Sequence, residues 1–153
     1  MSGDGAPARP MALPRATVRR EVRIARSAAD VWALVGAPER VHEWFPGIES
    51  CTVDGDSRVI VTGSGIPMPE QILTCDPIQR RFQYRITAPM ITEHTSTIDV
   101  HDLGDGTCLV VYSCDADPST MALVIGGASG NALAHLRTLV EGAPERTVLE
   151  GGD

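Results

Sequence analysis

The sequence predicts one α+β domain in which a curved, seven-stranded antiparallel sheet surrounds a long C-terminal helix. Three observations predict it. The apolar residues near the N-terminus change from a two-residue to a helical period, the middle of the chain carries six further period-two segments, and the last periodic segment is helical. An antiparallel sheet of this length must bury one face, and only the helices are available to cover it.

The first strand and two short helices are recognised by how they begin and end. Alternating apolar residues predict a strand over residues 16–25. Ser27 then serves as the N-cap of a short helix that ends at Gly36. Residues 38–45 begin with Pro at a first-turn position and run for about two turns before Pro46 stops them, so they predict a second short helix.

Six period-two segments follow and are separated by turn residues. The dipeptides Asp54-Gly55 and Asp105-Gly106 are typical of hairpin turns, and residues 63–69 predict a longer Gly/Pro loop. The predicted strands cover residues 48–53, 57–62, 70–75, 81–87, 92–101 and 107–114.

The long helix is predicted from Ser119 to Gly142, and its middle is rich in glycine. Gly126, Gly127 and Gly130 each cost on the order of 1 kcal/mol relative to Ala. Two explanations stay open. The small residues open volume for a ligand, or they mark a kink or local break with no consequence for a ligand.

The ends of the chain differ from this core in composition. Residues 1–15 are rich in Gly, Pro and Ala, and residues 143–153 are similar, so we expect two flexible tails around a single domain at residues 16–142. No stretch approaches the roughly 20 apolar residues of a membrane helix, and no signal peptide is recognised at the N-terminus. A cytoplasmic location without membrane insertion follows by default.

Charge and cysteine usage exclude several functions. All 13 basic residues are Arg, and the absence of Lys excludes Schiff-base chemistry. The net charge of −7 argues against a nucleic-acid partner, which needs a basic surface. The cysteines form no C-x-x-C pair, so we expect no metal site; a disulfide stays open, and buried free thiols are the simpler interpretation. They are Cys51, Cys75, Cys108 and Cys114.

Three stretches of the chain resemble a known family. They are EVRIARSAADVWALVGAPERVHEWFPGIES, EQILTCDPIQRRFQYRI and NALAHLRTLVEG. Val31-Trp32, Trp44 and Pro46 carry the resemblance, which is to the START-like superfamily and most closely to its polyketide cyclase/dehydrase-type (SRPBCC) proteins, and which covers residues 21–142. The resemblance implies a helix-grip fold, like that of the birch-pollen-allergen-like proteins, with a cavity for an apolar molecule between sheet and long helix. That superfamily includes lipid carriers, hormone receptors and aromatase/cyclases, so membership does not choose the chemistry.

Strand parity predicts which side chains face this cavity. In three strands, the alternation of side chains predicts which residues face inward. For the last strand alternation does not decide, and the family resemblance implies that the aromatic residue at position 112 faces inward. The residues expected to face inward are Glu70, Ile72 and Thr74; Phe82, Tyr84 and Ile86; His94, Ser96, Ile98 and Val100; and Val110, Tyr112 and Cys114.

Glu70 and His94 are the candidates for acid–base catalysis, because burial moves the pKa values of such groups toward neutrality. The alternative is that Glu70 bonds to a loop backbone and that His94 is a satisfied residue at the sheet edge. Tyr84 and Tyr112 fit a core role with bonded hydroxyls as well as ligand contact. His135 fits the surface of the long helix.

The predicted binding site combines these side chains with a rim. Trp44 is assigned to packing under the second short helix, and Phe45 and Met68 to an adjustable rim. The full predicted set of ligand-binding residues is Trp44, Phe45, Met68, Glu70, Phe82, Tyr84, Ile86, His94, Ser96, Tyr112, Ile125 and Ser129. No cofactor is expected.

Three hypotheses for the function follow. The first is binding or carriage of a small hydrophobic molecule, such as a lipid, polyketide or aromatic metabolite. The second is an aromatase/cyclase- or dehydratase-type enzyme that uses the acid–base groups of the same cavity. The third, a protein-interaction module, finds little support in an acidic chain with no obvious exposed apolar patch. The sequence leaves the oligomeric state open.

Overall fold

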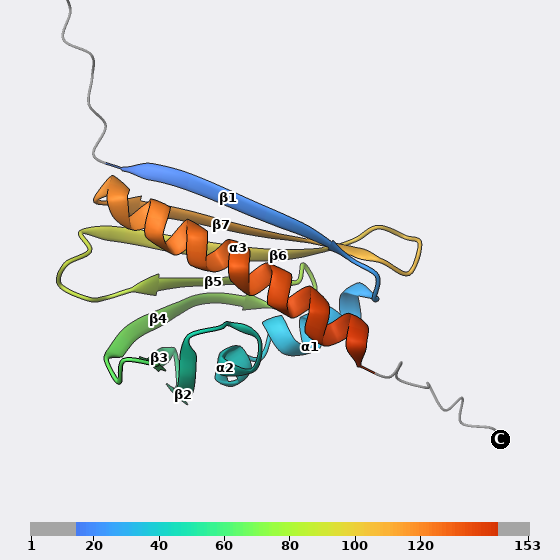
Figure 1. The fold of residues 1–153 in the computed structure, drawn as a ribbon, viewed down its shortest axis with the longest axis horizontal. Helices are drawn as coiled ribbons and strands as arrows, with labels where there is room; N and C mark the ends of the chain where they lie inside the picture. The colour runs from blue at the N-terminus through green and yellow to red at the C-terminus, as the bar shows by residue number, and fades with distance from the viewer. Residues whose placement is uncertain (1–14, 144–153) are drawn as a thin grey trace, which may run out of the picture.

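The computed structural model describes residues 15–143 and confirms the predicted α+β, helix-grip architecture (Figure 1). Seven antiparallel strands form one sheet in the order β1-β7-β6-β5-β4-β3-β2, and the sheet curves around the C-terminal helix. Residues 1–14 and 144–153, which hold most of the two predicted tails, lie outside the described residues.

The elements follow the predicted order. The strands are β1 (Ala16–Ile24), β2 (Ile48–Asp54), β3 (Ser57–Thr62), β4 (Pro67–Asp76), β5 (Arg81–Ile86), β6 (Glu93–Asp102) and β7 (Cys108–Asp117). The helices are α1 (Ala28–Val35), the 3-10 helix η1 (Pro38–Arg40), α2 (Val41–Trp44) and α3 (Ser119–Gly142). The N-cap of α1 is as predicted, because the Ser27 hydroxyl accepts a hydrogen bond from the Asp30 N–H at 3.1 Å.

Two predicted boundaries differ from the structure. The second short helix divides into η1 and α2, and the loop predicted over residues 63–69 is shorter because β4 already begins at Pro67. Pro67 and Pro69 lie opposite Val61 and Val59 of β3. Proline occupies a strand where its nitrogen is not needed as a donor, so these two residues do not mark a loop here.

The glycines of α3 bring the helix close to β1. A Cβ atom on Gly126 would lie 2.4 Å from Cγ1 of Val18, and one on Gly130 would lie 3.4 Å from Cδ of Arg20. A Cβ atom on Gly127 would meet nothing within 4 Å. The helix is continuous from its first to its last residue, so the local break, one of the two explanations left open, does not occur, and none of these glycines lines the cavity described below. Gly126 and Gly130 let the helix lie close to β1, whereas Gly127 has no such contact.

This close approach decides where space remains in the domain. The helix packs mainly on β1 and β7, along one side of the sheet, while α2 lies over the other side near β2 (Figure 1). The concave face of β3, β4 and β5 is therefore less closely covered by α3. The hollow described in the next subsection lies there.

The inward faces predicted for β5 and β6 are confirmed, because Phe82, His94 and the alternate residues that follow them in these strands are buried. The prediction was wrong for Thr74. The register of β4 against β5 shifts between Ile72 and Thr74, and the Thr74 hydroxyl bonds to Gln83 at 2.9 Å on the opposite face. A one-residue bulge of this kind inverts the alternation that follows it.

All four cysteines are free thiols, although not all are buried as expected. Cys108 and Cys114 are buried, Cys51 is half-buried and Cys75 is exposed. No helix among residues 15–143 is long and apolar enough to cross a membrane.

Candidate functional site

A largely apolar cavity of about 300 Å³ lies between the N-terminal half of α3, the turn after α2 and the concave face of β3–β5. Such a volume is at the lower end of the range of roughly 300–1,000 Å³ found for small-molecule sites. Apolar side chains from all three sides form its wall. They include Val41, Phe45, Ile60, Met68, Ile86 and Ile125.

A buried ion pair forms the polar part of this wall. Arg58 and Glu70 lie opposite each other in β3 and β4, and each side chain is only 3% exposed. Nε of Arg58 donates to Oε2 of Glu70 at 2.7 Å, and Nη2 lies 2.5 Å from the same oxygen. The guanidinium carbon lies 4.8 Å from the ring centroid of Tyr84 and 5.2 Å from that of Phe82, and Nη1 donates to the carbonyl of Pro38 at 3.3 Å. The buried cation thus has an anion, two aromatic faces and a carbonyl to compensate its lost hydration.

The pair brings two opposite charges into the cavity wall. Burial raises the pKa of the Glu70 carboxyl above its usual range, and the neighbouring Arg58 guanidinium acts in the opposite direction. An Arg guanidinium is not deprotonated in proteins. The two groups together therefore carry no net charge when the carboxylate is ionised.

Two tyrosine hydroxyls meet beside this pair. The hydroxyls of Tyr84 and Tyr112 are hydrogen-bonded to each other. Burial, followed by the negative charge of Glu70, raises the pKa of Tyr84 to about 12, and burial raises the pKa of Tyr112 as well. Both hydroxyls stay protonated near neutral pH, and only Tyr84 lines the cavity.

The His94 side chain makes hydrogen bonds within the sheet and does not line the cavity. Its Nδ1 accepts a hydrogen bond from the Ile86 N–H at 2.9 Å, and its Nε2 lies 2.9 Å from Oγ of Ser96. Since Nδ1 accepts, the ring proton of the neutral imidazole is on Nε2 and is donated to Ser96. The paired register of β5 and β6 reaches only as far as Tyr84 and Ser96, so the imidazole takes the place of a strand partner for Ile86. Burial lowers the pKa of His94 to about 4.

The predicted site residues divide into two groups. Those that line the cavity are Phe45, Met68, Glu70, Tyr84, Ile86 and Ile125. Those that are buried without lining it are Trp44, Phe82, His94, Ser96, Tyr112 and Ser129. Of the two candidates for acid–base catalysis, the structure therefore places only Glu70 in the cavity wall.

Trp44 packs beneath the cavity rim, as assigned from the sequence. Its side chain is 2% exposed, and its ring centroid lies 5.8 Å from that of Phe45. Ser129, another member of the predicted set, donates its hydroxyl to the carbonyl of Ile125 within α3, at 2.8 Å.

Arg58 is the charged residue of the cavity wall that was not predicted from the sequence. Its strand alternates Arg58 and Ile60 on one face with Val59 and Val61 on the other, so hydrophobicity alone does not decide which face is inward. A buried Glu70 directly opposite in β4 was the missing signal, and that register becomes known only in the folded sheet.

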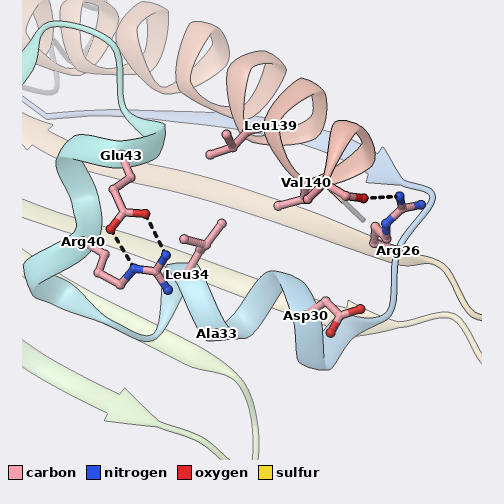
Figure 2. A pocket seen from close by; sticks show the side chains of 9 residues that line it. Arg26, Asp30, Ala33, Leu34, Arg40, Glu43, Leu139 and Val140 are labelled. Carbon is pink, nitrogen blue, oxygen red and sulfur yellow. Dashed lines mark hydrogen bonds and ion pairs between the residues drawn. The ribbon is translucent and has the colours of Figure 1, made fainter. Parts of the chain in front are cut away.

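A second hollow of about 390 Å³ lies between α1 and the C-terminal end of α3 (Figure 2). Three of its four charged side chains already have hydrogen-bond partners, and Asp30 is the fourth. Arg40 bonds both carboxylate oxygens of Glu43 at 2.7 Å, and Arg26 donates to the carbonyls of Glu141 and Ala143 at 2.9 Å, which caps the helix end. These contacts describe a structural junction between helices.

No cluster of His, Cys, Asp and Glu side chains that could hold a metal ion occurs in the described part of the chain. The polar side chains that line the cavity are those of the Arg58–Glu70 pair, Tyr84 and Thr62, and the rest of its wall is apolar.

Comparison with known proteins places these features in a family context. The model of the family described as polyketide cyclase/dehydrase and lipid transport matches residues 15–143. No curated protein matches the chain.

Several solved structures share the fold. An uncharacterised protein from Bacillus thuringiensis is 25% identical with a TM-score of 0.76, covering 82% of this chain and 99% of its own. A protein from Thermobifida fusca is 29% identical with a TM-score of 0.66, covering 84% and 97%. Norcoclaurine synthase from Thalictrum flavum, solved as a point mutant with a transition-state analogue, is 17% identical with a TM-score of 0.67, covering 86% and 98%. At that identity the last likeness concerns the fold alone.

Proposed function

Since the chain belongs to the polyketide cyclase/dehydrase and lipid transport family of START-like proteins, we propose that it binds a small hydrophobic molecule between α3 and strands β3–β5. The observation that carries this proposal is the cavity of about 300 Å³ with an almost entirely apolar wall. Burying an apolar ligand there is favourable by about 25 cal/mol for each Å² removed from water.

The size of the cavity narrows the class of ligand. A volume at the lower end of the usual range favours a molecule of a few fused rings or a chain of medium length over a lipid with two long chains. An aromatic or polyketide-like metabolite fits this description. We also infer, from composition, a cytoplasmic location and no nucleic-acid partner.

A second candidate function is catalysis of the cyclase or dehydratase type in the same cavity. One observation favours it, namely a Glu70 carboxyl in the cavity wall with a pKa raised by burial. In that role Glu70 would take a proton from carbon next to a carbonyl of the ligand. His94 has no part in it, because both of its ring nitrogens are engaged in the sheet.

Native mass spectrometry of the purified protein tests for a co-purified ligand, and a fluorescence titration with N-phenyl-1-naphthylamine tests for the site. The variant Ile125→Trp fills the cavity from α3, and Met68→Trp fills it from β4. Leu139→Trp is the matched control, because it adds the same side chain to the second hollow on the same helix.

We expect the probe to bind the wild-type protein and Leu139→Trp, and to bind both cavity variants at least about tenfold more weakly, provided that circular dichroism shows them folded. The opposite pattern, with binding lost only in Leu139→Trp, would move the site to the second hollow. A wild-type protein that binds no apolar probe would refute the proposal. For the second candidate, turnover of a polyketide-like substrate that survives Glu70→Gln unchanged would exclude Glu70 as the base.

A further inference from the structure

We propose that the Arg58–Glu70 pair selects, among apolar molecules that fit the cavity, those that carry a hydroxyl group or another uncharged hydrogen-bond donor. The donor would bond to Oε1 of Glu70. This inference rests on the proposed function, because it names the ligand class of the same cavity.

The geometry leaves one carboxylate oxygen unused. Both contacts from Arg58 go to Oε2 of Glu70, and Oε1 has no hydrogen-bond partner among residues 15–143. In that part of the chain, Nε1 of Trp44 is the one fully buried side-chain nitrogen or oxygen without a partner. Oε1 therefore keeps a small accessible surface. Because the Glu70 side chain is 3% exposed and lines the cavity, that surface faces the cavity.

An ionised carboxylate oxygen is a hydrogen-bond acceptor only, so its natural partner is a donor. In an apolar enclosure an acceptor without a partner is unfavourable, and a hydrogen bond to a charged group is about twice as strong as one between neutral groups. A ligand hydroxyl at this position would satisfy Oε1 while the rest of the molecule contacts the apolar wall.

The charge of the site favours a neutral donor over an ion. Arg58 already neutralises Glu70, and these two are the only charged side chains among the described residues of the wall. A ligand ammonium or carboxylate would bring a third, uncompensated charge into a site where burial of charge is costly. The neighbouring Tyr84 hydroxyl is hydrogen-bonded to that of Tyr112, and no hydrogen bond joins it to Glu70.

Three naphthalenes of similar shape test the proposal by displacement of N-phenyl-1-naphthylamine at pH 7. 2-Naphthol donates a hydrogen bond, 2-methoxynaphthalene cannot, and 2-naphthoate is an anion. The variant Arg58→Met/Glu70→Leu removes both charges together, so that neither remains buried alone. The matched control is Arg81→Met/Asp99→Leu, which removes a cross-strand Arg–carboxylate pair from the outer face of β5 and β6.

We expect 2-naphthol to bind the wild-type protein and the control at least about tenfold more tightly than 2-methoxynaphthalene. In the cavity double variant the two should bind within about threefold of each other, with the affinity for 2-methoxynaphthalene retained. Should that variant not fold, 2-naphthalenemethanol and 2-naphthalenemethanethiol, both uncharged at pH 7, replace it as a test on the wild-type protein. A thiol is a weak donor of similar shape, so the thiol must bind clearly more weakly than the alcohol.

The inference would be overturned if the wild-type protein bound 2-naphthol and 2-methoxynaphthalene equally tightly. It would also be overturned if the preference for 2-naphthol survived in the cavity double variant. Tightest binding of 2-naphthoate would overturn it as well, because Arg58 would then be the selecting group. In each of these cases the cavity still binds an apolar molecule, so the proposed function stands. Failure of every naphthalene and of the probe itself to bind refutes the proposed function, and the inference with it.

Discussion

Removing one partner of the Arg58–Glu70 pair should destabilise the protein far more than removing both. The variant Glu70→Leu leaves a guanidinium that is 3% exposed without its anion, and Arg cannot escape by losing a proton. We expect a loss of about 3–5 kcal/mol of unfolding free energy, the usual cost of an uncompensated buried charge. Arg58→Met should cost less, because the carboxyl of Glu70 can take up a proton and become neutral.

The double variant Arg58→Met/Glu70→Leu should be close to the wild-type protein in stability. Two buried charges are then replaced by apolar side chains of comparable size, a change that is often neutral or stabilising. The coupling free energy between the two sites should accordingly be at least about 3–5 kcal/mol, the cost of Glu70→Leu alone. It should fall as the pH is lowered, because protonation of Glu70 makes the Arg58→Met variant less costly.

The outer face of the sheet offers a matched comparison. Arg81 bonds Asp99 through two contacts of 2.7 and 3.0 Å, also between neighbouring strands, but the Arg81 side chain is 44% exposed. Arg81→Met should cost less than about 1 kcal/mol, because water screens an exposed pair.

Urea unfolding followed by tryptophan fluorescence and circular dichroism measures all four variants by linear extrapolation. The reasoning is refuted if the costs of Glu70→Leu and Arg58→Met simply add in the double variant. It is equally refuted if Glu70→Leu costs no more than Arg81→Met.

Three further predictions concern the helix, the sheet and the cavity rim. Gly127→Ala should stabilise the protein by up to about 1 kcal/mol, because alanine favours the helix and its Cβ atom would meet nothing. Gly126→Ala should be about 1–3 kcal/mol less stable than Gly127→Ala, because its Cβ atom would collide with Val18 of β1. Urea unfolding measures both variants, and equal effects would contradict the close contact with β1. The pKa of His94 is about 4 in the folded protein and near 6.5 in the unfolded chain. Between these two pH values the unfolded state therefore binds more protons than the folded state. The free energy of unfolding should fall by up to about 3 kcal/mol as the pH drops from 6.5 to 4. His94→Asn should remove this part of the slope in unfolding experiments at several pH values, and an unchanged slope would contradict it. In a Trp32→Phe variant, the fluorescence of Trp44 should change when an apolar probe saturates the cavity, because its ring lies 5.8 Å from that of Phe45 in the wall; no change would confine Trp44 to core packing.

Local signals account for the parts of the fold that were predictable. The Ser27 cap, the hairpin dipeptide at residues 54–55 and the alternation in β5 and β6 depend on residues close in sequence, and each has the predicted structure. The bulge after Ile72 was not predictable in this way. Nothing in the local pattern of β4 marks it, and it turned Thr74 to the outer face.

The candidate site was predictable only in outline, because its chemistry depends on contacts between distant segments. Parity identified Glu70 and Tyr84 as inward, and both line the cavity. The same parity could not tell that His94 would bond the Ile86 N–H, since that depends on where the pairing of β5 and β6 ends.

The sequence by itself determined the order of the elements, the inner faces of β5 and β6 and the family, because period, capping and turn residues act over a few positions. Only the tertiary structure decided that Arg58 of β3 meets Glu70 of β4 in the cavity wall, because strand register is a property of the assembled sheet. It also decided the role of Gly126, whose missing side chain lets α3 rest on Val18 of β1. The cavity lies over β3–β5 because the helix is held against the other side of the sheet.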